Sequence, residues 1–166
     1  MHTSKLHAAS KERGQSLFEL VVAIAVSALI MVAIVTLAVN SIQNSVFSKN
    51  KALAATYAQQ ATEWLRGQRN SSIDTFMTNA NDLTATDPVT HKVTWCLRGP
   101  KILTWDKRGA CSSTDFITGT SFKRQVAFSA DASAGKTIFE TDVTVSWTDS
   151  KGVHEVVSIT NLADLR

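Results

Sequence analysis

A single carboxylate stands at the border of the longest uncharged segment in the chain. Glu19 directly precedes Leu20–Ser48, in which the sequence holds no Asp, Glu, Lys or Arg. An unpaired charge costs roughly 2.5–3.5 kcal/mol at the centre of a bilayer on insertion scales, and an acid near the edge still favours a positively charged partner. We therefore treat Glu19 as a candidate functional residue whose chemistry is ion pairing.

The second candidate chemistry is redox chemistry at two cysteines. Cys96 and Cys111 are the two cysteines of the chain, and an even number in an exported domain predicts a disulfide. A closed loop of about fifteen residues would stabilise the fold by roughly 3 kcal/mol on the chain-entropy model. The alternative is a pair of reduced thiols. The spacing does not match a zinc site, because no pair of histidines lies near.

Basic side chains gather between Lys92 and Arg124, and two tryptophans lie among them. Two acids oppose seven cations in this segment, which leaves a local balance of about +5. Cations interleaved with aromatic rings are typical of single-stranded nucleic-acid binding. The alternative is an ordinary solvated loop. The candidate polyanion site consists of Arg98, Lys101, Lys107, Arg108, Lys123 and Arg124.

The remaining polar residues form no catalytic pattern. His91 and His154 are isolated in strand-like runs. The sequence contains no Gly-rich phosphate loop and no Gly-x-Ser-x-Gly motif. We therefore predict that the protein is not an enzyme and that it uses no cofactor or metal.

The element that positions Glu19 is predicted to be a transmembrane helix. Leu20–Val39 is a run of twenty residues interrupted only by Ser27 and Thr36. As a helix it would span about 30 Å, the thickness of a bilayer core, and satisfy its own backbone there. A secretory signal has a shorter apolar region followed by a small-residue cleavage site. Asn40–Gln43 offers no such site, so conventional signal cleavage is the weaker alternative.

Helical spacing continues beyond the membrane run. The chain has no Gly or Pro until Gly67, and apolar residues recur every three, four or seven positions. We predict one helix from about Ser16 to Arg69. A length this far above the globular average requires an explanation.

The rest of the chain predicts a sheet. Gly67–Pro88 is a polar loop with a short helical turn at Ile73–Met77. Asp149–Gly152 is a turn signal that joins the last two strands in an antiparallel hairpin. A long helix followed by antiparallel strands is an α+β fold. Strands are expected at His91–Leu97, Phe122–Ser129, Thr137–Trp147 and Val153–Asn161.

The segment Lys11–Glu19, KERGQSLFE, together with the apolar run that follows it, resembles the prepilin signature of type IV pilins and type II secretion pseudopilins. The resemblance implies that residues 1–14 are a basic leader, which a prepilin peptidase removes after Gly14 on the cytoplasmic side. Gln15 would then be the methylated N-terminus. Glu19 would meet the N-terminal amine of a neighbouring subunit during assembly, and each charge would relieve the desolvation of the other.

The resemblance also implies the pilin fold, in which a long helix packs on a C-terminal antiparallel sheet. Residues 15–39 would be the transmembrane and filament-core helix, 40–69 its amphipathic continuation, and 70–166 the globular sheet domain. Ala58–Arg66 further resembles minor pilins of the modification-protein group. One departure is the absence of a proline in Val35–Leu37, where many pilins carry one.

Three functions follow from these observations. The leading hypothesis is a structural subunit, a minor pilin or pseudopilin, of a type IV pilus-like filament. Its partners would be other pilin subunits, the prepilin peptidase and the bacterial inner membrane, from which the filament reaches the periplasm or the exterior. The second is a surface or tip subunit that binds DNA or another polyanion through Lys92–Arg124. The third is a single-pass membrane-anchored domain with no filament role.

Overall fold

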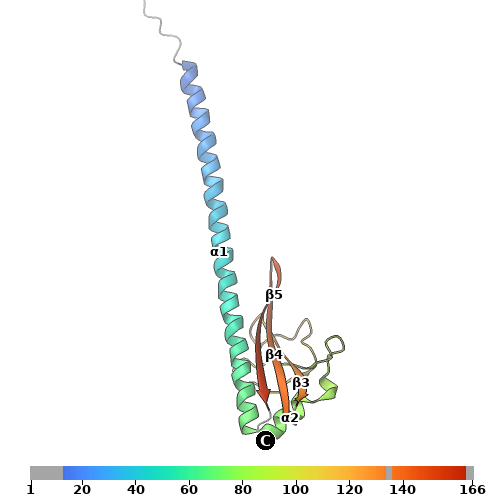
Figure 1. Ribbon diagram of the computed structural model, residues 1–166. Helices are drawn as coiled ribbons and strands as arrows, with labels where there is room; N and C mark the ends of the chain where they lie inside the picture. The colour runs from blue at the N-terminus through green and yellow to red at the C-terminus, as the bar shows by residue number, and fades with distance from the viewer. Residues whose placement is uncertain (1–12, 134–135, 164–166) are drawn as a thin grey trace, which may run out of the picture. The chain divides into compact units, whose positions relative to one another are not determined.

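The computed structural model describes residues 13–133 and 136–163 of the chain (Figure 1). Of the predicted leader, residues 1–12 lie outside the described residues. The first element is the helix α1, Arg13–Ser71, which agrees with the predicted helix to within a few residues at either end. The chain divides into two units, one ending at Phe47 and one beginning at Ser48, and each is described by itself.

In the first unit, α1 is long and apolar enough to cross a membrane. Its most apolar window has a mean hydropathy of 3.0 and carries no buried residue. Every side chain from Leu17 to Val46 is exposed. The hydroxyls of Ser27 and Thr36 donate to the carbonyls of Ala23 (2.7 Å) and Val32 (2.9 Å) one turn earlier. These two polar side chains are therefore satisfied within the helix, which allows it to lie in an apolar medium.

The second unit places the later part of α1 against an antiparallel sheet, as the α+β prediction expected. Two short helices, α2 (Ile73–Ala80) and η1 (Leu83–Ala85), follow α1. The sheet has the strand order β2-β1-β3-β4-β5, and every neighbouring pair is antiparallel. Its strands are β1 (Val93–Cys96), β2 (Lys107–Arg108), β3 (Lys123–Ser133), β4 (Lys136–Asp149) and β5 (Gly152–Ala163).

Small side chains on one face of α1 let the helix approach the sheet. Ala54, Ala58, Ala61 and Leu65 are at most 1% exposed, and their spacing of four, three and four residues places them on a single helical face. Thr62 belongs to the same buried face, and its hydroxyl lies 3.2 Å from that of Ser158 on β5. This face therefore fixes the helix on the sheet.

An aromatic cluster fills the core beneath α2. Phe76, Phe128 and Phe139 are buried, and their rings meet nearly edge to face at centroid distances of 5.7–6.4 Å. Edge-to-face pairs of this kind add about 0.5–1.5 kcal/mol each beyond the area they bury. The indole of Trp95 donates to the carbonyl of Asn79 (3.0 Å) and so ties β1 to the end of α2.

The predicted hairpin between the last two strands is present. Asp149 pairs with Gly152, and Trp147 pairs with His154. Gly152 has a φ of 123°, a conformation that favours glycine. The carboxylate of Asp149 accepts the backbone N–H of Lys151 (2.7 Å) inside the turn. The sequence prediction missed β2, which consists of only two residues.

Candidate functional site

The residues of the predicted processing site lie at the start of α1. Gly14 and Gln15 fall within its first turn, and Glu19 follows Gln15 by four residues, so the helix places both on one face a single turn apart. The side chain of Glu19 is exposed. A carboxylate in this position is available to a positively charged group outside the chain.

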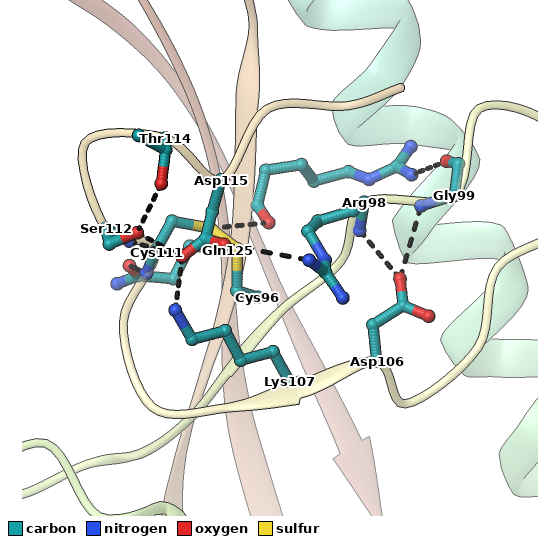
Figure 2. The surroundings of a disulfide bond; sticks show 11 residues. Cys96, Arg98, Gly99, Asp106, Lys107, Cys111, Ser112, Thr114, Asp115 and Gln125 are labelled. Atoms are coloured by element: carbon teal, nitrogen blue, oxygen red, sulfur yellow. Dashed lines mark hydrogen bonds and ion pairs between the residues drawn. A yellow bond between two sulfur atoms is a disulfide. The ribbon is translucent and has the colours of Figure 1, made fainter.

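The disulfide is the covalent feature of the second unit. Cys96 on β1 is bonded to Cys111, with Cα atoms 5.0 Å apart, and Figure 2 shows its surroundings. Cys96 is fully buried. The backbone N–H of Cys111 donates to the side-chain oxygen of Gln125 on β3 (3.2 Å). The bond thus closes residues 97–110 into a loop that is attached to the sheet at both ends.

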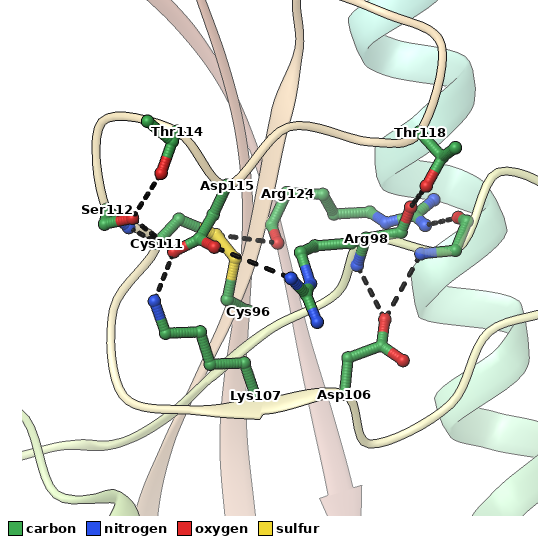
Figure 3. Close-up of polar contacts among 11 residues, drawn as sticks. Cys96, Arg98, Asp106, Lys107, Cys111, Ser112, Thr114, Asp115, Thr118 and Arg124 are labelled. Carbon is green, nitrogen blue, oxygen red and sulfur yellow. Dashed lines mark hydrogen bonds and ion pairs between the residues drawn. A yellow bond between two sulfur atoms is a disulfide. The ribbon is translucent and has the colours of Figure 1, made fainter.

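Asp115 is the centre of the polar network beside the disulfide (Figure 3). Its carboxylate accepts from Lys107 Nζ (2.5 Å) and from the backbone N–H and hydroxyl of Ser112 (2.8 and 2.6 Å). Arg98 Nη1 lies 3.8 Å away. The hydrogen bond from Lys107, followed by those from Ser112, holds the pKa of Asp115 well below its usual range. The carboxylate therefore stays charged at any ordinary pH and anchors two cations.

Asp106 organises the first half of the same loop. It accepts the backbone N–H groups of Arg98 (2.8 Å) and Gly99 (3.2 Å), and the hydroxyl of Thr104. The loop turns so tightly here that a Cβ added at Gly99 would overlap the carbonyl oxygen of Ile102. Asp106 thus holds the Arg98–Gly99 peptide in place at the start of the loop.

The assignment of Arg124 to a polyanion site was wrong. Arg124 lies on β3 and is completely buried, between Phe122 and Val126, which are buried as well. Its guanidinium donates to the carbonyl oxygens of Gly99 (2.5 Å) and Tyr57 (3.4 Å). Burial lowers its pKa to about 10. The alternation of the strand turns this side chain inward, so it contributes no exposed charge.

The other predicted cations are largely occupied within the fold. Arg108 pairs with Asp82 (2.6 Å), and its guanidinium carbon lies 5.2 Å from the ring centroid of Trp95. Lys123 Nζ lies 5.3 Å from the ring centroid of Phe116. Lys101 is exposed at the edge of an open groove along α1. The cluster is therefore less positive than its sequence count, because acids such as Asp82 come from outside the counted segment.

Sequence reasoning missed the partners that neutralise these cations. Asp115 was counted only as one opposing charge, yet it binds both Lys107 and Arg98. Nothing in the local sequence indicates that Asp82, twenty-six residues before Arg108, would join the same surface. For Arg124 a signal was present, since Phe122, Val126 and Phe128 mark its phase in the strand as the buried one.

The structure defines the class of protein first. One helix long and apolar enough to cross a membrane leads into a disulfide-bonded α+β domain, an arrangement that fits a membrane-anchored protein. The comparison with known families concerns the N-terminal segment. Residues 9–35 match the prokaryotic N-terminal methylation motif, which supports the resemblance of this segment to type IV pilins and pseudopilins. Searches of curated proteins and of solved structures found no match.

Proposed function

We propose that the chain is a minor pilin or pseudopilin that is cleaved after Gly14 and assembled through α1 into a type IV pilus-like filament. The observation that carries the proposal is the methylation motif at residues 9–35, combined with the uncharged stretch Leu20–Val46 of α1, whose side chains are all exposed in the single chain. A surface of this kind requires either lipid or other subunits around it.

The helix surface supports close packing against neighbouring helices. Ala23, Ser27 and Ala28 leave a shallow apolar depression on α1 between Ile24 and Met31. Small residues let helix backbones approach in an apolar medium, where packing rather than the hydrophobic effect drives association. In the proposed mechanism the helix rests in the inner membrane first, and packing against other subunits replaces lipid contacts during assembly.

Glu19 supplies the electrostatic part of the proposal. After cleavage the new N-terminal amine at Gln15 is positive, and Glu19 lies one helical turn further along. Pairing Glu19 with the amine of a neighbouring subunit would offset the desolvation cost of both charges. The disulfide-bonded domain suits the oxidising side of the membrane.

The first test is mass spectrometry of the mature N-terminus, using membranes from a host that has a prepilin peptidase. We expect a chain that begins at Gln15 and carries one added methyl group. Gly14→Val is the control, and it should leave the leader attached. A wild-type chain that still begins at Met1, or that is cut after Val39, contradicts the proposal.

The second arm of the same test addresses assembly. Glu19→Gln keeps the size of the side chain and removes its charge, so we expect normal cleavage and a loss of the protein from sheared filaments. Glu19→Asp retains the charge and is the matched control. If Glu19→Gln enters filaments as well as the wild type does, the carboxylate has no role in assembly, whereas a wild-type chain that is absent from filaments would be a membrane-anchored domain with no filament role.

A further inference from the structure

Arg124 is a buried cation that is held by carbonyls instead of a carboxylate. No ion pair joins its guanidinium to any acid in the described part of the chain. Its Nη2 donates to the Gly99 carbonyl at 2.5 Å and its Nη1 to the Tyr57 carbonyl at 3.4 Å, while its buried Nε has no partner among the described atoms. A buried charge is costly unless its hydrogen bonds are made, so the shorter bond, to Gly99, is the important one.

Gly99 lies in the loop that the disulfide closes. The strand β1 ends at Cys96, and the next backbone N–H, that of Leu97, donates to the Arg124 carbonyl oxygen (2.9 Å). Cys111 Sγ lies 3.4 Å from that same oxygen. The two ends of the loop therefore meet beside the backbone of Arg124, and the loop returns over its side chain. Figure 3 shows the disulfide beside Arg124.

Three elements converge on this one guanidinium. Tyr57 belongs to α1, Gly99 to the loop, and Arg124 itself to β3. The hydrogen bonds of Asp106 to the Arg98 and Gly99 N–H groups hold the first part of the loop in place, and the disulfide holds its end. The disulfide is therefore the covalent restraint on the loop that carries the Gly99 carbonyl.

We propose that the Cys96–Cys111 bond is a redox switch for the folding of the domain, because it seats the Gly99 carbonyl on the buried Arg124 guanidinium. In the dithiol form the cation loses its closest acceptor. The loss of stability then extends beyond the loop to β3 and to α1 at Tyr57. This inference goes beyond the filament role and does not depend on it, since it concerns only the second unit.

The chemistry of the switch is thiol–disulfide exchange. One thiolate of the pair attacks an external disulfide, that of a dithiol oxidoreductase or of oxidised glutathione, and displaces one of its sulfurs as a thiol. The other cysteine then attacks the mixed disulfide and releases the second thiol. One S–S bond forms and one breaks, and the cysteines transfer two electrons and two protons to the oxidant. The domain thereby acquires its full stability only in an oxidising compartment.

A double-mutant cycle between the disulfide and Arg124 tests the switch. Three full chains are unfolded with urea in detergent micelles: the wild type, Arg124→Met and Arg66→Met. Each is measured twice, once with the disulfide intact and once after reduction with dithiothreitol. Arg66 is exposed on α1 and pairs with Glu63, so it is the matched control. Reduction should lower the urea midpoint by the same amount in the wild type and in Arg66→Met. In Arg124→Met the shift should be at most about half of the wild-type shift. Equal shifts in all three chains would overturn the proposal.

Hydrogen exchange on the wild type keeps the proposal testable if Arg124→Met does not fold. Amide exchange is compared in the oxidised and reduced chain by mass spectrometry of peptides. We expect reduction to accelerate exchange at 97–111, at 123–128 on β3 and at 57–61 on α1. Acceleration confined to 97–111 would show that the disulfide stabilises only its own loop, and the switch would be excluded.

Discussion

At the scale of single residues, the chain uses its acids to organise loops. The carboxylate of Asp115, a residue that is 7% exposed, forms ion pairs with Lys107 and Arg98 and accepts a hydrogen bond from Ser112. The contacts with Lys107 and Ser112 lower its pKa. A carboxyl whose pKa is lower in the folded state contributes stability that is fully present above its unfolded pKa, near 3.9, and is lost as the pH falls through the folded value. This residue therefore links loop structure to acid stability.

Asp115→Asn should remove that part of the pH dependence. The variant should unfold at a lower urea concentration than the wild type at pH 7, because two cations lose their shared partner. As the pH falls below about 4 the difference should shrink, because the unfolded wild-type chain takes up a proton at Asp115 whereas the folded chain keeps the carboxylate charged. Urea midpoints from pH 2 to 7 measure this, with the exposed Glu155→Gln on β5 as the control. A difference that does not depend on pH would show that the carboxylate acts by shape alone.

The sequence predicted the chemistry of individual residues unevenly. The disulfide between Cys96 and Cys111 followed from their number and is confirmed. The polyanion site was less successful, because charge counted along a sequence ignores which side chains a strand turns inward. Arg124 shares the buried face of β3 with Val126 and Phe128. The period of two in that segment predicts its burial, whereas the pairing of Arg108 with Asp82 follows only from the folded structure.

At the scale of elements, the buried face of α1 depends on small residues. Ala58 is 1% exposed and lies between Ala54 and Ala61, both at 0%. Ala58→Leu inserts a larger side chain between helix and sheet, so we expect a loss of about 1–3 kcal/mol of unfolding free energy. The control is Gln59→Leu on the exposed side of the helix. Urea denaturation of both variants in the same detergent measures the difference in unfolding free energy. Equal stabilities would mean that the packing of α1 does not depend on its close approach to the sheet.

The prediction of elements succeeded wherever the periodic signal was long. The helix predicted from Ser16 to Arg69 is observed as Arg13–Ser71, and the turn predicted at Asp149–Gly152 joins β4 to β5. Shorter elements were harder. The predicted helical turn at Ile73–Met77 is an eight-residue helix. The strand β2 was not predicted, because two residues are too few to show an alternating pattern. It is defined by its antiparallel pairing with β1.

At the scale of the whole molecule, the buried core belongs to one unit. Among the described residues, every buried apolar side chain lies between Ala54 and Leu162. The first unit, which ends at Phe47, exposes its apolar side chains along the helix. The second unit therefore meets the usual requirements for independent folding, an internal core and its own disulfide, whereas the first unit requires lipid or other subunits.

A chain that begins at Ser48 should fold without detergent. It retains the buried alanine face of α1, the sheet and the disulfide, so we expect sharp near-ultraviolet circular dichroism from the buried tryptophans and a single cooperative urea transition. A chain that begins at Leu65 is the control. It lacks the three buried alanines and the Tyr57 carbonyl that Arg124 contacts, so it should fail to fold. If the Ser48 chain shows only a broad transition, the first unit contributes to the stability of the second, and the domain depends on residues that its core does not contain.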